Sequence, residues 1–191
     1  MLATLLENID KVANTASVYA AFLKKIKKTA KYLFRMRPAN FTKNKIYNNE
    51  VFNEDIEILI KKIEGDVLYL DPPYNNRQYA SNYHLLETIA RYDNPSLRGK
   101  TGLRNYSHQK SKFSQKNEVL KSFENIIQNA KVKYIFLSYN NEGLMNEKDI
   151  KRIMTKRGEY GYLKKKYGRF ASVKNKNVQF IIEYLHYIKC Y

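Results

Sequence analysis

The run Asp71-Pro72-Pro73-Tyr74 is the part of the sequence whose residue types and spacing could perform chemistry. Asp71 offers a carboxylate that only accepts hydrogen bonds. Pro72 offers a carbonyl oxygen in a backbone that two consecutive prolines hold extended. Tyr74 adds a flat aromatic face. Two fixed acceptors beside that face suit a planar, polar ring that stacks on Tyr74 and points the hydrogens of an exocyclic amine at both acceptors.

The same two acceptors would assist an adenine amine as it attacks a methyl sulfonium. This amine is a weak nucleophile because its lone pair is conjugated into the ring. Fixed acceptors stabilise the positive charge that develops on the nitrogen in the transition state. Asp71 need not be a strong base, since the proton becomes acidic once the nitrogen is alkylated. A structural interpretation stays open, because Asp before Pro starts turns and two prolines end a strand stiffly.

Two short apolar runs are the strands that would position this motif. Residues 67–70 are continuously apolar, which suits a strand buried on both faces of a parallel sheet, and they lead directly into Asp71. Residues 132–139 are a second candidate for a buried strand, and Asn140 follows them. Ligands of α/β sheets bind beyond the carboxyl ends of the strands. Asp71 and Asn140 are therefore predicted to lie at one candidate site.

Helical periodicity predicts five helices, over residues 2–35, 54–64, 83–92, 117–129 and 146–157. The first would carry an apolar stripe from Tyr19 to Leu33. Lys24 and Lys28 would lie on its opposite, basic face, which could contact phosphates or simply be solvated. In the third helix, Leu85, Leu86 and Ile89 would point inward.

The remaining segments complete an α/β pattern. Residues 39–50 and 75–82 are expected to be loops, and residues 93–116 a long polar, basic connection. Residues 160–170 and 178–189 predict a closing antiparallel hairpin. The sheet is therefore expected to be mostly parallel with an antiparallel finish.

The charge balance points to a polyanionic partner. Among 191 residues, 35 are Lys or Arg and 18 are Asp or Glu, so the formal net charge is +17. Such an excess usually indicates nucleic acid, although Lys, Asn, Ile and Tyr are all abundant, so part of it could be compositional. The 43% hydrophobic content excludes wholesale disorder, and the length predicts one domain with at most a small appendage.

The single cysteine, Cys190, excludes an internal disulfide framework and any zinc site made of several cysteines. No metal site is predicted. One cysteine fits a reducing cytoplasm. No apolar run approaches the length of a membrane span, and the first residues lack the layout of a signal peptide. We therefore expect a cytoplasmic protein with no membrane partner.

The residues from Asp71 to Tyr79, and those from Asn82 to Ala90, resemble the DNA adenine methylase family. Its members are S-adenosylmethionine-dependent, adenine-specific DNA methyltransferases, and the sequence looks most like the type II and IIS modification methylases of restriction–modification systems. Similar stretches continue at residues 13–24, 99–104, 136–144 and 183–186. The likeness spans almost the whole chain; it is specific for the family and uninformative about the target sequence.

The resemblance implies a class I, Rossmann-like methyltransferase fold and an adenine flipped out of double-stranded DNA. Asp71, Pro72, Pro73 and Tyr74 would form the catalytic motif. Asp71, Asn82 and Tyr83 would lie beside S-adenosylmethionine, with ordinary helix packing as the alternative for the segment from Asn82 to Glu87. The candidates for DNA contact, which could instead be ordinary exposed residues, are Arg77, Gln78, Tyr79, Arg98, Lys100, Arg104, Lys24 and Lys28.

The family's Gly-rich cofactor turn is missing before Asp71. Glycine is needed there because the backbone approaches the cofactor closely. We therefore expect a fold incomplete in its N-terminal half, from a truncated, frameshifted or split gene, with a separately encoded half as a candidate partner. Residues 1–50 would be a helical, basic segment ending the target-recognition region, and residues 51–191 the catalytic α/β part. The loss would expose an apolar strand edge at residues 67–70 and weaken cofactor binding.

The leading functional hypothesis is an adenine-specific DNA methyltransferase, or its catalytic and recognition half. A noncatalytic DNA-binding remnant and a methyltransferase that acts on RNA are the alternatives, and protein methyltransferases also use a related motif. Asp rather than Asn at position 71, followed by Arg77-Gln78-Tyr79, favours adenine in DNA.

Overall fold

The computed structural model describes residues 1–16, 18–38, 49–168 and 180–191. Contacts divide the chain into two units. Unit 1 contains residues 1–50 and 77–110, and unit 2 contains residues 51–76 and 111–191. The expected loop at residues 39–50 and the connection within the final hairpin lie largely outside the described residues. The domain division predicted after residue 50 stays a prediction.

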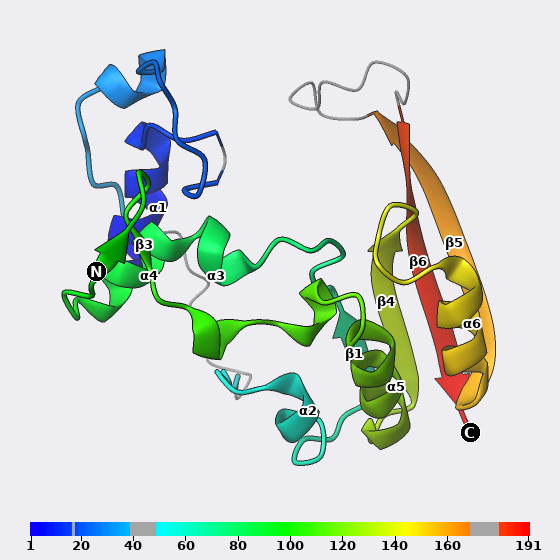
Figure 1. Cartoon of the computed structure of the whole chain (residues 1–191). Helices are drawn as coiled ribbons and strands as arrows, with labels where there is room; N and C mark the ends of the chain where they lie inside the picture. The colour runs from blue at the N-terminus through cyan, green and yellow to red at the C-terminus, as the bar shows by residue number, and fades with distance from the viewer. Residues whose placement is uncertain (17, 39–48, 169–179) are drawn as a thin grey trace. The chain divides into compact units, whose positions relative to one another are not determined.

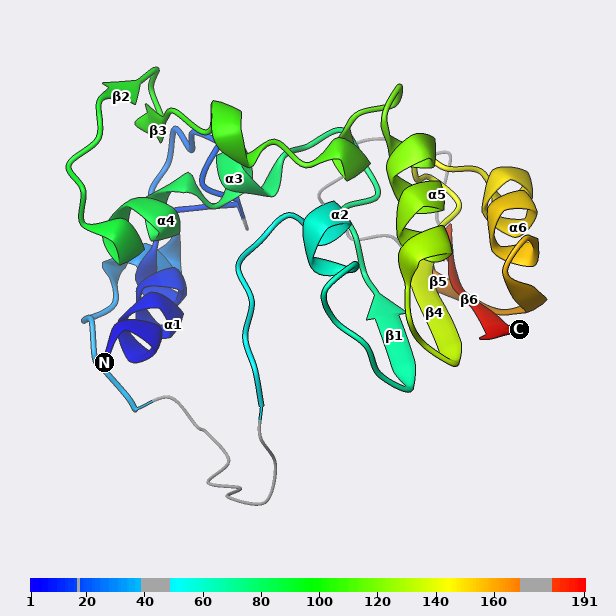
Figure 2. The ribbon, with the colours of Figure 1, turned by 90° about the horizontal axis from the view of Figure 1, so that it is seen from below.

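Unit 2 is built on a four-stranded sheet with the order β1-β4-β6-β5 (Figures 1 and 2). Its strands are β1 (Val67–Leu70), β4 (Tyr134–Asn140), β5 (Gly158–Gly168) and β6 (Phe180–Cys190). β1 is parallel to β4, whereas β6 is antiparallel to both β4 and β5. The expected strands and closing hairpin are confirmed. The expected parallel majority is wrong among the described strands, because the single parallel pairing is β1 with β4.

Three helices accompany this sheet: α2 (Ile56–Leu59), α5 (Val119–Asn129) and α6 (Glu147–Thr155). Figures 1 and 2 show α5 and α6 side by side against one face of the sheet. Asn146 caps α6, since its side chain accepts a hydrogen bond from the Asp149 N–H at 2.9 Å. The helix predicted over 54–64 is shorter and begins after Asp55, whose carboxylate caps it, instead of after Asn53.

The core of unit 2 lies between these helices and the sheet. Ile135, Leu137 and Tyr139 alternate along β4, and each is at most 1% exposed, against the buried Phe123 of α5 and Ile153 of α6. This alternation gives β4 one covered face.

The opposite face of the sheet is open to solvent. Val67 and Tyr69 of β1 are 56% and 60% exposed, so the expectation that this strand is buried on both faces is wrong for the described chain. The register aligns these two residues with Tyr134 and Phe136 of β4. β1 is also an edge strand of the described sheet, which agrees with the apolar strand edge expected at residues 67–70.

Unit 1 contains short elements: α1 (Leu2–Val12), the 3₁₀ helix η1 (Lys28–Lys31), α3 (Tyr79–Asn82), α4 (His84–Arg91), β2 (Leu97–Arg98), β3 (Leu103–Arg104) and the 3₁₀ helix η2 (Ser107–Gln109). One further 3₁₀ helix, η3 (Lys112–Ser114), belongs to unit 2. β2 and β3 form an antiparallel hairpin. Gly99 and Gly102 stand at its turn with φ values of +68° and +65°, which glycine adopts without strain.

The long helix predicted over residues 2–35 is wrong beyond Val12. The backbone becomes extended at Ala13, and short polar side chains then bind backbone groups that a helix would use. The Thr15 hydroxyl donates to the Val18 carbonyl at 2.8 Å, and the Asn14 side chain accepts from the Lys27 N–H at 3.0 Å. Phe22, Ile26 and Leu33 of the expected apolar stripe are consequently exposed, at 60%, 66% and 77%.

Three other expectations need correction. The expected loop at residues 75–82 contains α3, and the expected structureless connection at residues 93–116 contains the β2–β3 hairpin with η2 and η3. The helix predicted over 83–92 is confirmed as α4, but Leu85 is 39% exposed instead of inward-facing. None of the helices formed by the described residues is long and apolar enough to cross a bilayer.

Candidate active site

The Asp-Pro-Pro-Tyr motif begins where β1 ends. Leu70 is the last residue of β1 and pairs with Leu137 of β4, and Asp71 follows at once. Because the two strands are parallel, their carboxyl ends meet at the same edge of the sheet, where β4 ends at Asn140. The prediction that Asp71 and Asn140 come to one edge is therefore confirmed.

Tyr74 is tied to the loop after β4 through its backbone carbonyl. This oxygen accepts hydrogen bonds from the Leu144 N–H at 2.9 Å and from the Tyr139 hydroxyl at 3.4 Å. The Tyr139 hydroxyl in turn accepts from the Met145 N–H at 3.3 Å. The rings of Tyr74 and Tyr139 meet edge to face, with centroids 6.1 Å apart. These contacts fix the end of the motif against the loop that follows β4.

Tyr139 is the centre of this arrangement. It is 1% exposed, and burial raises the pKa of its hydroxyl, which therefore remains a hydrogen-bond donor at neutral pH. Its ring passes so close to Gly143 that a Cβ at that position would lie 2.2 Å from the ring. Sequence reasoning missed both residues. The available signal was the alternation along β4, which puts Tyr139 on the same face as the buried Leu137.

The two polar ends of the site differ in availability. Asp71 is exposed, whereas the following residues of the motif are partly buried. Asn140 is 5% exposed, and its side-chain oxygen accepts from the Glu142 N–H at 3.1 Å, so it shapes the turn after β4. The arrangement thus offers an open carboxylate on a fixed backbone, beside an anchored aromatic residue.

The two remaining cofactor candidates belong to unit 1. The Asn82 carbonyl accepts from the Tyr19 N–H at 2.7 Å. Tyr83 is 42% exposed and packs edge to face on Tyr79, with ring centroids 5.8 Å apart. Tyr83 also lines a surface hollow, together with Leu6, Glu7, Asp10, Thr15, Lys27 and Leu86.

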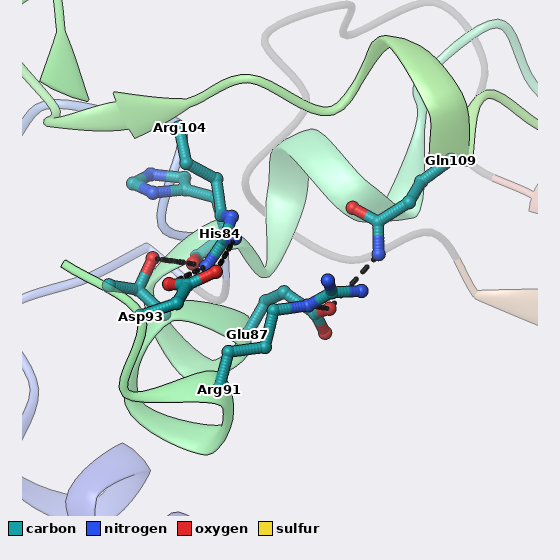
Figure 3. Close-up of polar contacts among 7 residues, drawn as sticks. His84, Glu87, Arg91, Asp93, Arg104 and Gln109 are labelled. Carbon is teal, nitrogen blue, oxygen red and sulfur yellow. Dashed lines mark hydrogen bonds and ion pairs between the residues drawn. The ribbon is translucent and has the colours of Figure 1, made fainter. Parts of the chain in front are cut away.

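Among the DNA candidates, Arg104 is placed differently from the rest. Its side chain is 6% exposed, and its guanidinium donates to both carboxylate oxygens of Asp93, at 3.0 Å from Nη1, and to the Thr88 hydroxyl at 3.4 Å (Figure 3). The Arg104 guanidinium is therefore not exposed to solvent, and its hydrogen bonds connect β3 to the end of α4. The other lysines and arginines among these candidates, Arg77, Arg98, Lys100, Lys24 and Lys28, are exposed. Gln78 is partly buried and Tyr79 is 53% exposed.

The ion pairs around Arg104 shift the pKa values of two carboxyls. Hydrogen bonding to Arg104 holds the pKa of Asp93 below its ordinary value, and hydrogen bonding to Arg91 does the same for Glu87. Glu87 also accepts from the Gln109 amide at 3.0 Å (Figure 3). His84 lies beside this network, 1% exposed, and burial lowers its pKa. Neither of its ring nitrogens has a hydrogen-bond partner among the described residues.

Comparisons with known proteins agree with the motif. The sequence profile of the D12 class N6 adenine-specific DNA methyltransferase family matches residues 1–153. The type II methyltransferase M.NlaIII of Neisseria lactamica is 49% identical over 193 residues, which cover 99% of this chain and 57% of that protein. The type II methyltransferase M.FokI of Planomicrobium okeanokoites is 42% identical over 99% of this chain and 30% of its own length.

The modification methylase StsI of Streptococcus sanguinis is 37% identical over 99% of this chain and 29% of its own length. The chain therefore spans about half the length of the first of these relatives and less than a third of the other two. No solved structure matches the chain.

Proposed function

Since the chain belongs to the family of D12 class N6 adenine-specific DNA methyltransferases, we propose that it supplies the catalytic part of an enzyme that methylates the exocyclic amine of adenine in DNA. The observation that carries the proposal is the placement of the Asp-Pro-Pro-Tyr motif at the carboxyl end of β1, with the Tyr74 carbonyl held by the loop after β4. The printed names of the relatives, type II methyltransferases and a modification methylase, support a role in restriction–modification.

In this proposal the motif binds a flipped adenine and activates its amine. The ring stacks on Tyr74, and the amine donates to the Asp71 carboxylate and the Pro72 carbonyl. These acceptors stabilise the positive charge that grows on nitrogen, and they do so more strongly in the transition state than before it. Asp71 is exposed, so the proton released after alkylation passes from its carboxylate to solvent.

S-adenosylmethionine is the proposed methyl donor, and when bound it supplies an electrophilic methyl group. The described residues fit only part of its site. Asp71 offers an open carboxylate, but close approach of backbone to the cofactor needs glycines. Several of the described glycines serve elsewhere: Gly99 and Gly102 turn a hairpin, and Gly143 and Gly161 lie under the rings of Tyr139 and Tyr187.

We propose that a further polypeptide segment completes the sheet and the cofactor site, either within a longer protein or as a separately encoded half. The exposed apolar face and the edge strand β1 support this. An unpaired edge with exposed Val67 and Tyr69 is a surface that proteins normally cover. The completed sheet would be of the class I, Rossmann-like type. On addition of the part of M.NlaIII outside the aligned segment, amides of residues 67–70 should exchange more slowly; unchanged exchange would contradict completion at this edge.

Duplex DNA with a flipped adenine is the proposed substrate. Arg77, Gln78, Tyr79, Arg98, Lys100, Lys24 and Lys28 are proposed contacts, whereas Arg104 is proposed to position the hairpin that carries Arg98 and Lys100. Because lysines and arginines replace counterions on phosphates, duplex affinity should fall steeply with salt, by about a thousandfold between roughly 50 and 200 mM. Titrations with labelled duplex at several salt concentrations measure this; a flat response would remove the basic residues from the proposal.

Activity itself is tested in a chimera that joins this chain to the part of M.NlaIII outside the aligned segment. Duplex DNA incubated with the chimera and S-adenosylmethionine should gain N6-methyladenine, detected by mass spectrometry of the nucleosides. A chimera that is folded, binds duplex DNA and S-adenosylmethionine, and leaves adenine unmethylated would favour a noncatalytic, DNA-binding protein.

A further inference from the structure

The end of the β5–β6 hairpin projects beyond the rest of the sheet (Figure 1). β4 ends at Asn140, which pairs with Glu183, so residues 180–182 of β6 and residues 166–168 of β5 extend past the last residue of β4. Asn141 and Ile182 are still connected by two hydrogen bonds: the Asn141 N–H donates to the Ile182 carbonyl at 3.1 Å, and the Asn141 side-chain oxygen accepts from the Ile182 N–H at 2.9 Å. We refer to residues 163–168 and 180–185 as the basic ribbon. Its outer half, residues 166–168 and 180–182, is two-stranded, whereas β4 flanks its inner half, because residues 183–185 of β6 pair with residues 138–140 of β4. Because β6 starts where β4 ends, the ribbon projects from the edge of the sheet at which Asp71 lies.

Three consecutive lysines, Lys164, Lys165 and Lys166, are exposed on β5 of the ribbon. Successive residues of a strand point to opposite faces, so Lys164 and Lys166 lie on one face and Lys165 on the other. None of the ion pairs found among the described residues involves these three lysines. The nearest carboxylate in the hairpin register is that of Glu183, opposite Lys165, and it makes no ion pair with this lysine in the described structure.

Aromatic rings hold two of these ammonium groups. The Lys166 Nζ lies 4.0 Å from the centroid of the Phe180 ring, and the Lys165 Nζ lies 5.0 Å from that of Tyr167. A ring face attracts a cation without cancelling its charge, so it restrains the lysine head and leaves its hydrogens available to an anion. The ribbon thus presents restrained positive charge on both faces.

We propose that the basic ribbon binds duplex DNA by entering a groove next to the target adenine. The inference rests on the proposed DNA substrate, and it adds a contact surface in unit 2. A two-stranded β-ribbon fits the major groove, whose two walls carry phosphates on either side of the inserted strands. Lys166 lies on the two-stranded end that can enter the groove, and Lys164 and Lys165 lie at its base, level with the end of β4, where they can contact the phosphates that border the groove. The ribbon also leaves the same edge of the sheet as Asp71, so DNA bound there lies near the proposed site of methylation.

The test compares two triple variants of the full chain that lose the same charge. The ribbon variant is Lys164→Gln/Lys165→Gln/Lys166→Gln. The control is Lys121→Gln/Lys131→Gln/Lys189→Gln, three exposed lysines outside the ribbon, of which Lys189 pairs in register with Tyr134 at the other end of β4. Fluorescence anisotropy with a labelled duplex gives the affinity and its salt dependence, and thermal unfolding verifies that both variants are folded.

Each lost phosphate contact lowers the slope of log affinity against log salt by about 0.9. The ribbon variant should therefore lose about 2 to 3 from the slope and bind at least about tenfold more weakly at 100 mM salt, while the control stays within about threefold of the unmodified chain. If the unmodified chain binds duplex tightly and the two variants have equal affinity and salt dependence, the proposal that the basic ribbon binds DNA is overturned, and the proposed DNA substrate is not. No duplex binding by the unmodified chain would overturn the ribbon together with the proposed DNA substrate.

Discussion

Different kinds of contact stabilise the interior of each of the two units. Unit 2 buries apolar side chains between a sheet and two helices, and Phe123, Ile126, Ile135 and Leu137 are each 0% exposed. Among the described residues, Tyr19 is the one buried apolar side chain that unit 1 contributes. The other buried side chains of unit 1 are polar: Asn8, Thr15, His84 and Arg104. Unit 1 therefore depends on specific polar pairings, whereas unit 2 depends on a packed core.

The largest expected effect comes from the core of unit 2. Phe123→Ala should lower the free energy of unfolding of unit 2 by about 3–5 kcal/mol, because it removes a buried ring and leaves a cavity. Ile89→Ala, at a partly buried position of α4 in unit 1, should cost less than half as much. Urea unfolding, followed by exchange of amides in each unit, measures both. Equal losses would contradict the difference between the units.

Acid should next destabilise unit 2 through His186. This side chain is 1% exposed, its Nδ1 lies 2.8 Å from the Tyr160 hydroxyl, and burial lowers its pKa from 6.5 to about 4. The unfolded chain therefore binds a proton before the folded chain does. The stability gained from neutral His186 is complete above about pH 6.5 and is lost as the pH falls toward about 4, by up to about 3 kcal/mol.

Urea unfolding at pH 7 and pH 4.5 tests this loss in the unmodified chain. The variant His186→Phe removes the titrating group and should flatten the dependence in this range. A slope that persists unchanged in His186→Phe would assign the pH dependence to other groups.

A smaller effect is expected at the anchor of the active-site motif. Gly143→Ala forces a methyl group into the Tyr139 ring and should cost about 1–3 kcal/mol. Tyr139→Phe removes the hydroxyl shared with Tyr74 and Met145 and should cost about 1 kcal/mol. Thermal unfolding of both variants measures these losses. Gly65→Ala is the control, since nothing lies within 4 Å of a Cβ there. A Gly143→Ala variant as stable as Gly65→Ala would show that close packing of the Tyr139 ring on Gly143 does not restrain the motif.

The smallest and most local effect is expected in unit 1. Asp93→Asn removes the charge that binds Arg104, so the β2–β3 hairpin should open more often while unit 2 is unaffected. Acid should have the same effect. Arg104 lowers the pKa of Asp93 below 3.8, so the contact persists as the pH falls to that value and weakens below it. Hydrogen exchange of the amides of residues 97–104 follows the change. Exchange that does not accelerate would show that Arg104 does not hold the hairpin.

The difference between the units also explains which elements sequence reasoning found. In unit 2, the periodic segment at 117–129 corresponds closely to α5, because burial of its apolar side chains determines the local structure. The apolar run at 67–70 corresponds to β1, although Val67 and Tyr69 are exposed. In unit 1, a three- to four-residue periodicity predicted a helix through Leu33, but the stripe is buried at Tyr19 and 77% exposed at Leu33. Hydrogen bonds between residues such as Asn14 and Lys27 decide the conformation, and periodicity does not report them.

The candidate site divides in the same way. The motif at residues 71–74 and its place after a strand were predicted, because they depend on residue types and on parallel topology. The roles of Tyr139 and Gly143 were not predicted, because they depend on the register of β4 and on a ring lying over one backbone position. Arg104 was predicted as a DNA contact because its burial against Asp93 cannot be seen in composition.

The central claim is that the Asp71 carboxylate accepts a hydrogen bond from the reacting amine. The most direct measurement is the single-turnover rate of adenine methylation by the chimera with M.NlaIII, in three forms: unmodified, Asp71→Ala, and the control Asp66→Ala, whose exposed carboxylate pairs with Lys133 on the surface. We predict that Asp71→Ala lowers the rate by at least about a hundredfold while duplex binding is kept, and that Asp66→Ala leaves the rate unchanged. Methylation by Asp71→Ala at the unmodified rate would contradict the account.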